Sequence, residues 1–129
     1  MIAIGTGVIA AFIIIVLGQL LRKMVDPALM VSACLVAIAF IYVGFSLEDN
    51  RPSIIVSESA LALVFYFMAM IGYTNKSALA AVGIILHGVW DACHHHAWAV
   101  STTVPAYWPT FCCTVDIIDG VYFYFLLKK

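Results

Sequence analysis

The chain has 129 residues, of which 65% are hydrophobic and only 10% are charged, and its formal net charge is −1. Its mean hydropathy is +1.10, whereas about a quarter of the residues of a typical soluble domain are charged. One soluble core of this size cannot bury so much apolar surface. The composition therefore excludes a soluble globular protein and indicates an integral membrane protein, for which we expect no nucleic-acid partner.

Five apolar stretches have about the 20 residues that a helix needs to cross the hydrocarbon core of a bilayer. The first, 2–21, contains no charge. It is not predicted to be a cleaved signal peptide, because it lacks a basic start and a small-residue cleavage motif. The second, 27–47, follows Asp26 and Pro27, a helix-capping residue and a proline at the first helical position.

The remaining stretches, in chain order, are 53–73, 77–98 and 109–127. The connections between stretches are only a few residues long, so consecutive helices are expected to be antiparallel neighbours. We predict an all-α fold in which residues 1–129 form a single transmembrane domain of five helices.

The basic residues predict the orientation of this bundle. With five crossings, Arg22, Lys23, Lys76, Lys128 and Lys129 fall on one side and Arg51 falls on the other. Loops rich in lysine and arginine stay in the cytoplasm. We therefore expect a multi-pass protein of the cell membrane with its N-terminus outside and its C-terminus inside.

Acidic residues lie within the predicted helices without any lysine or arginine beside them. These acids are Glu58, Asp91, Asp116 and Asp119. An ionised carboxylate at the middle of a bilayer costs on the order of 3 kcal/mol. The four carboxyl groups must therefore be protonated, hydrogen-bonded to histidines, in contact with water, or neutralised by a cation.

All four histidines of the chain lie in the stretch HGVWDACHHH at 87–96. At 100° per residue, four side chains spaced i, i+4, i+7 and i+8 share one helix face, and they are His87, Asp91, His94 and His95. His96 is predicted to point away from that face. In the last helix, Cys112, Asp116 and Asp119 share a face in the same way.

The rise along each helix predicts which of these groups lie at the same depth. At about 1.5 Å per residue, His87 and Asp116 both fall near the bilayer middle. His94 and His95 fall about two turns further out, and Glu58 reaches roughly the level of His94. The polar side chains of three helices should therefore meet in one region that opens outward.

Imidazole and carboxylate together suit a divalent transition metal, which would also cancel the buried negative charge. The predicted ligands are His87, Asp91, His94, His95 and Asp116. Zinc is favoured, with iron or copper as alternatives. Cys112 is a candidate soft ligand. The competing interpretation is a structural hydrogen-bond network between helices.

The chain resembles a family of small bacterial multi-helix membrane proteins that is known only as a domain of unknown function. The resemblance rests on Glu58, the stretch LHGVWDACHH at 86–95, a proline-containing outer loop, and Cys112 with Asp116. The family has a second cysteine directly before that aspartate, where this chain has Val115. This departure weakens a cysteine-based metal site, and the family brings no established activity.

A looser chemical similarity links the histidines to the alkaline ceramidases, seven-helix membrane hydrolases that hold zinc with intramembrane histidines. It implies a metal-dependent hydrolase acting on a lipid or apolar substrate that enters from the membrane, with Glu58 or Asp119 as the general base. A metal-dependent oxidoreductase acting on such a substrate is the other form of this hypothesis. Two alternatives stay open, a proton or cation transporter component and a non-catalytic accessory subunit of a membrane complex. Membrane lipid is the expected partner, and the sequence leaves the oligomeric state open.

Overall fold

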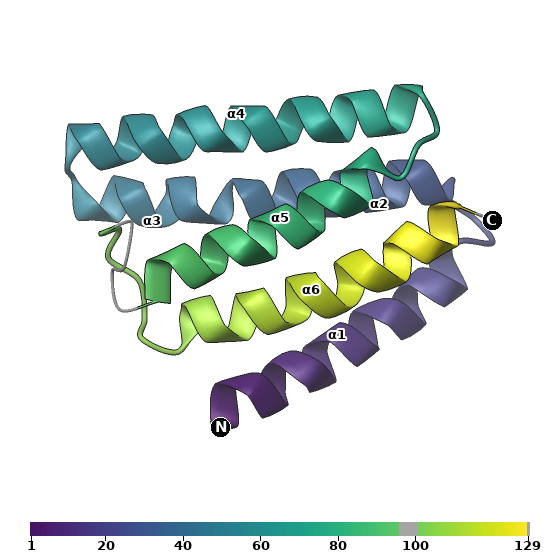
Figure 1. The fold of residues 1–129 in the computed structure, drawn as a ribbon, viewed down its shortest axis with the longest axis horizontal. Coiled ribbons are helices and arrows are strands. Elements are labelled where there is room, and N and C mark those ends of the chain that lie inside the picture. The colour runs from purple at the N-terminus through teal and green to yellow at the C-terminus, as the bar shows by residue number, and fades with distance from the viewer. Residues whose placement is uncertain (96–100, 129) are drawn as a thin grey trace.

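The computed structural model describes residues 1–95 and 101–128, which form helices and no strand. The helices are α1 (Ile2–Leu21), α2 (Pro27–Ala39), α3 (Ile41–Asp49), α4 (Pro52–Thr74), α5 (Leu79–His94) and α6 (Trp108–Leu127). They lie side by side, with α1 at one edge of the bundle beside α6 and α4 at the opposite edge (Figure 1). The all-helical prediction is confirmed for the described part of the chain.

Prolines and one capping aspartate set several helix starts. The Asp26 carboxylate accepts a hydrogen bond from the backbone N–H of Leu29 at 3.1 Å, and Pro27 occupies the first turn of α2. α4 begins at Pro52 and α6 has Pro109 in its first turn. Proline suits these positions because its missing N–H would have no partner there.

Two predicted helices differ from the structure. The helix expected at 27–47 is divided at Phe40 into α2 and α3 and continues to Asp49. No proline lies at the division. The helix expected at 77–98 begins at Leu79 and ends at His94, because the backbone of His95 is extended (φ −63°, ψ 119°). Residues 96–100 lie outside the described ranges.

Four helical segments of the described chain are long and apolar enough to cross a membrane, counting α2 and α3 together as Pro27–Asp49. α5 is apolar but has only 16 residues, which is about 24 Å of helix against a hydrocarbon core of about 30 Å. Four of the five expected spans are therefore long enough to cross a membrane, and the remaining one, α5, is shorter.

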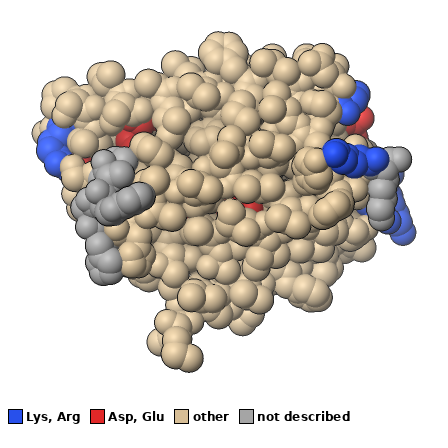
Figure 2. All heavy atoms as spheres, in the orientation of Figure 1, with Lys and Arg blue, Asp and Glu red and all other residues tan. Residues whose placement is uncertain are grey.

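Charged and apolar side chains are separated along the bundle. Lysine and arginine gather at its two ends, and a broad belt without them lies between (Figure 2). Large apolar side chains are widely exposed along the helices, for example Phe12 at 67% and Val56 at 68%. This distribution is typical of a surface in contact with lipid.

Ion pairs hold the polar ends together. At one end Lys76 Nζ lies 2.9 Å from Asp26 Oδ2, and this bond holds the pKa of the exposed Asp26 carboxyl below its usual range. At the other end Arg51 pairs with Asp49 at 2.6 Å, which raises the pKa of the guanidinium. Asp49 also accepts a hydrogen bond from the backbone N–H of Thr103, so the segment after α5 is tied to the turn between α3 and α4.

Small residues allow α6 to pack closely on both of its neighbours. α1 buries only Gly7, Ala11 and Gly18, and a Cβ at Gly7 would lie 2.9 Å from Cβ of Thr114 in α6. On the other side, a Cβ at Gly120 would lie 3.0 Å from the backbone nitrogen of Ile85 in α5. Close backbone approach through small residues is the usual way in which membrane helices associate.

Candidate metal site

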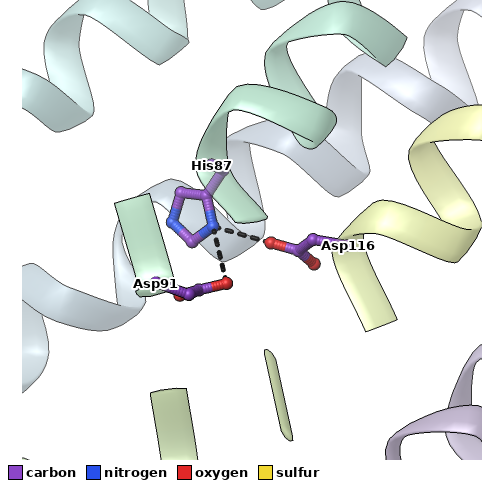
Figure 3. A group of neighbouring side chains, drawn as sticks. All are labelled: His87, Asp91 and Asp116. Atoms are coloured by element: carbon purple, nitrogen blue, oxygen red, sulfur yellow. Dashed lines mark hydrogen bonds and ion pairs between the residues drawn. The ribbon is translucent and has the colours of Figure 1, made fainter. Parts of the chain in front are cut away.

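Three buried side chains from α5 and α6 meet near the middle of the bundle and form what we call the inner cluster: His87, Asp91 and Asp116 (Figure 3). His87 Nδ1 lies 2.7 Å from Asp116 Oδ2 and 3.7 Å from Asp91 Oδ2. One candidate ligand atom of each residue lies within 4.8 Å of the others. None of the three residues is more than 4% exposed.

The local sequence and one glycine explain why these groups meet. His87 and Asp91 are four residues apart on α5 and therefore share a face. Between them, Gly88 brings α5 close to α6, because a Cβ there would lie 3.1 Å from the Asp116 Cβ. The absence of a side chain at Gly88 thus lets the Asp116 carboxylate reach the imidazole.

The donor set fits a divalent transition metal. Neither oxygen of Asp91 has a hydrogen-bond partner in the described chain, although the residue is fully buried. Ligand atoms on a tetrahedral zinc stand about 3.4 Å apart, close to the His87–Asp91 separation of 3.7 Å. Asp116 Oδ2 and His87 Nδ1 are 2.7 Å apart. To reach the spacing of two ligands on one ion, they would have to separate by less than 1 Å. The described helices also contain no lysine or arginine that could neutralise the cluster.

A second polar group, which we call the outer cluster, lies toward the Arg51 end and centres on Glu58 of α4. Glu58 Oε1 lies 2.9 Å from His94 Nε2 and accepts a hydrogen bond from Thr102. Glu58 Oε2 accepts a hydrogen bond from Trp90 Nε1 at 3.3 Å. Glu58 is 2% exposed, so the outer cluster is buried like the inner one.

The hydrogen bonds of His94 indicate which of its two ring nitrogens carries a proton. Its Nδ1 lies 3.0 Å from the carbonyl oxygen of Trp90, which only accepts, so Nδ1 must donate. The other nitrogen shares a single proton with Glu58, as an imidazolium beside a carboxylate or an imidazole beside a carboxylic acid. In either form the His94–Glu58 pair has no net charge.

The predicted ligands are therefore divided between two clusters and the end of a helix. His87, Asp91 and Asp116 come together, whereas His94 bonds to Glu58. His95 follows the last residue of α5 and is exposed, so the i+8 position on the helix face does not apply to it. His96, predicted to point away, lies outside the described residues.

The two candidate general bases differ in their surroundings. Both oxygens of Glu58 already accept hydrogen bonds, one from Trp90 and one from Thr102. Asp119, one turn beyond Asp116, is 3% exposed and its Oδ1 has no partner in the described chain. Asp119 is thus the free buried carboxyl group of the pair.

The cysteines stay outside the inner cluster. Cys112 and Cys113 are partly buried and free, like the other two cysteines of the chain. Among the described residues, the group with metal-ligand geometry contains no sulfur. The candidate soft ligand Cys112 is not part of it.

Sequence reasoning missed Tyr42 and Thr102. The division of the second span at Phe40 is followed by Tyr42, whose ring stacks on His94 with centroids 4.0 Å apart and lies 5.9 Å from the His87 ring. A tyrosine in the middle of an apolar span, away from the interface where tyrosines gather, was the available signal. Thr102 lies in a loop and carried no such signal.

No family model, curated protein or solved structure matches this chain. The resemblance to the bacterial family of unknown function therefore stays a prediction. The structure itself defines an all-helical bundle with an apolar surface and a buried histidine and aspartate cluster.

Proposed function

We propose that this protein is a multi-pass cell-membrane protein that binds a divalent transition metal, zinc most favourably, through His87, Asp91 and Asp116. The observation that carries the proposal is the fully buried Asp91, whose two oxygens lack a hydrogen-bond partner in the described chain and whose ion pair with His87 is long, at 3.7 Å. Buried polar groups are nearly always hydrogen-bonded, paired or metal-bound. This set of three ligands replaces the wider set of five expected from sequence.

The same site supports a metal-dependent hydrolase acting on a lipid or another apolar substrate. Three protein ligands leave a fourth position open, as in catalytic zinc sites, and a bound metal would lower the pKa of a water molecule at that position. In this chain His87, Asp91 and Asp116 would hold the ion. Asp119 would accept the proton of the attacking water, because its Oδ1 is unengaged while Glu58 is occupied.

A lateral cavity supports an apolar substrate. Asp116 and Asp119 line a cavity of about 150 Å³ whose other walls are side chains of α1, α2, α5 and α6. It lies within the apolar part of the bundle, away from the loops. An apolar group in this cavity would lie beside the part of α6 that carries Asp116 and Asp119.

Elemental analysis of the purified full-length protein tests the proposal. We expect close to one transition-metal ion per chain in the wild type and strong losses in His87→Ala and Asp91→Asn. His94→Gln is the matched control, because it changes a histidine of the same helix that belongs to the outer cluster. A metal-free wild type, or an equal loss in His94→Gln, would contradict the assignment of the ligands.

A proton pathway is the second candidate, and Tyr42 favours it. Its ring lies between His94 and His87, and its buried hydroxyl has no partner in the described chain. The polar groups could then relay protons from the outer cluster to Asp116, as acids inside membrane proteins often do. Metal-free protein with voltage-dependent proton flux in liposomes, abolished in Tyr42→Phe, would select this alternative.

A further inference from the structure

A groove of about 350 Å³ lies between α2 and α4, which pack against each other at one edge of the bundle (Figure 1). The lining includes the small, buried residues Ser32 and Ala69 and the exposed side chains of Leu29 and Met70. On α2 the groove covers residues 29–37, about 12 Å along the helix axis. Small residues at the bottom and larger exposed ones at the rim make this part of the apolar surface hollow.

The dimensions of the groove suit an alkyl chain better than a partner helix. A 12 Å length of helix about 10 Å wide occupies roughly 900 Å³, more than twice the volume of the groove. A partner helix could therefore enter only with single side chains, and the space beside Ser32 and Ala69 would lose packing contacts. A flexible hydrocarbon chain of a membrane lipid can follow the bottom of the groove and fill it.

An exposed ion pair, Lys76 with Asp26, lies at one end of the groove. Leu29 lines the groove, and its backbone N–H donates to Asp26 Oδ1. Tyr73 also lines the groove, and Lys76 Nζ lies 4.5 Å from the centroid of its ring. The side chains of Lys76 and Asp26 are 56% and 46% exposed, so a lipid headgroup at this end can contact both charges.

Lys76 occupies a backbone position that is unusual for lysine. It follows the end of α4 with a left-handed φ of 50°, in a turn that the backbone N–H of Ser77 closes on the carbonyl oxygen of Gly72. Glycine or asparagine adopts this conformation with less strain. An exposed ion pair by itself contributes little to stability, so a lysine at this position indicates a use for its ammonium group beside the groove.

We propose that this groove binds one alkyl chain of a phospholipid whose headgroup carries both a phosphate and a primary ammonium, as in phosphatidylethanolamine. Lys76 has three N–H donors and can donate to the phosphate while it stays paired with Asp26. The ammonium of the lipid would donate to the Asp26 carboxylate. The inference depends neither on the metal nor on the hydrolase reaction.

The charges of the ion pair favour this headgroup over two others. Lys76 and Asp26 together carry no net charge, so a headgroup with one positive and one negative group matches both of them. An anionic headgroup without a cation would place its phosphate near Asp26 with nothing to offset the repulsion. A quaternary ammonium has no N–H to donate to the carboxylate.

A second apolar groove provides an internal control. It lies between α4 and α5, has a volume of about 260 Å³, and is lined among others by Leu86 and Cys93. The described residues that line it include no charged side chain. Lipid bound there should therefore show no preference for one headgroup.

Native mass spectrometry of the full-length, delipidated protein tests the proposal, because it resolves each bound lipid. The probes are phosphatidylethanolamine, phosphatidylcholine and phosphatidylglycerol with identical oleoyl chains. We expect phosphatidylethanolamine to bind the wild type about fivefold more tightly than the other two, as one exposed ion pair implies. Asp26→Asn should remove this preference and stay folded, because asparagine also caps helices well. Glu48→Gln, which changes an acid outside this ion pair, should keep the preference.

A further pair of variants tests the groove itself. Ala33→Leu adds bulk at an exposed position of the groove and should weaken all three lipids. Cys93→Leu adds bulk in the second groove and should leave the preference for phosphatidylethanolamine unchanged.

The inference is overturned if the three lipids bind the wild type equally, if Asp26→Asn keeps the preference, or if Ala33→Leu leaves the binding of phosphatidylethanolamine intact. A wild-type dimer that Ala33→Leu converts to a monomer would assign the groove to a second copy of the chain and would also overturn it. Neither substitution changes the inner cluster, so a preference that is lost in Asp26→Asn would uphold the lipid site even in a protein without metal.

Discussion

The inner and outer clusters contain the same kinds of side chain but differ in how completely these are paired. In the outer cluster, Glu58 accepts hydrogen bonds from Trp90 and Thr102 and shares a proton with His94. In the inner cluster, one imidazole faces Asp91 and Asp116, and neither oxygen of Asp91 has a hydrogen-bond partner in the described chain. The outer cluster is thus fully hydrogen-bonded within the described chain, whereas the inner cluster places two carboxyl groups against one imidazole.

We therefore assign a structural role to the outer cluster and a binding role to the inner cluster. A neutral, saturated cluster holds helices together and gains nothing from a cation. An unsaturated, acid-rich cluster gains from any cation of the right size, because the ion relieves both the charge and the missing hydrogen bonds. We therefore expect the two clusters to respond in opposite ways to mutation and to metal removal.

The largest effect is expected from Glu58→Ala. The substitution leaves His94 Nε2 and the buried donors of Thr102 and Trp90 without their partner, and breaking a buried pair in this way costs about 3–5 kcal/mol. Unfolding in mixed micelles with rising dodecyl sulfate measures the loss. Glu58→Gln, which keeps one acceptor, should lose less, and Glu48→Ala on the exposed surface should lose little.

Metal content should stay near the wild-type value in the folded fraction of Glu58→Ala. A large loss of metal at unchanged stability would reverse the roles that we assign to the two clusters.

Removal of the metal should have the next largest effect. When the free metal is present at a hundred times its dissociation constant, its binding stabilises the folded state by about 2.7 kcal/mol. Chelation should therefore lower the melting temperature of the wild type. Light scattering or intrinsic fluorescence measures the melting. The double variant Asp91→Asn, Asp116→Asn should melt at the same temperature with and without chelator.

His94→Gln should keep its response to chelator, since His94 belongs to the outer cluster. An unmoved melting curve in the wild type, together with a metal-free elemental analysis, would remove the basis for the metal site.

A smaller effect should follow from Gly120→Ala, which acts on the spacing of α5 and α6. The new Cβ would lie 3.0 Å from the backbone nitrogen of Ile85, so the helices must separate. Overpacking of this kind costs about 1–3 kcal/mol. The separation should also reduce metal content, because His87 lies on α5 and Asp116 lies on α6.

Gly44→Ala is the matched control, since a Cβ there would meet nothing within 4 Å. It should be neutral or slightly stabilising. Equal destabilisation by both glycine variants would show that packing of α5 on α6 is not what holds the inner cluster.

The smallest effect concerns the exposed Lys76–Asp26 pair and shows what a charge contact contributes outside the bundle. The bond from Lys76 lowers the pKa of Asp26 below its ordinary value of 3.8 in the folded state. Its contribution to stability is therefore present above that value and is lost as the pH falls through the folded-state pKa. Lys76→Met should reduce this loss at acid pH, measured by thermal melting from pH 6 downward.

High salt should abolish the difference between wild type and Lys76→Met, because the pair is exposed and screened. A difference that survived high salt would indicate that Lys76 stabilises the loop in another way.

Sequence by itself determined the apolar helices, several of their starts and the relative depth of the polar groups. Asp26 with Pro27, Pro52 and Pro109 set helix starts through local backbone chemistry alone. The rise of 1.5 Å per residue put Glu58 level with His94 and His87 level with Asp116, and the structure places both pairs in contact.

Only the tertiary structure decided that these groups form two clusters and not one. Helical periodicity defines the angle and height of a side chain within its own helix, but not how that helix is rotated or spaced against its neighbours. That rotation directs His94 to Glu58 and His87 to Asp116. The spacing at Gly88 and Gly120, the early end of α5 at His94 and the division at Phe40 all depend on contacts between helices, since packing overrides weak local propensity.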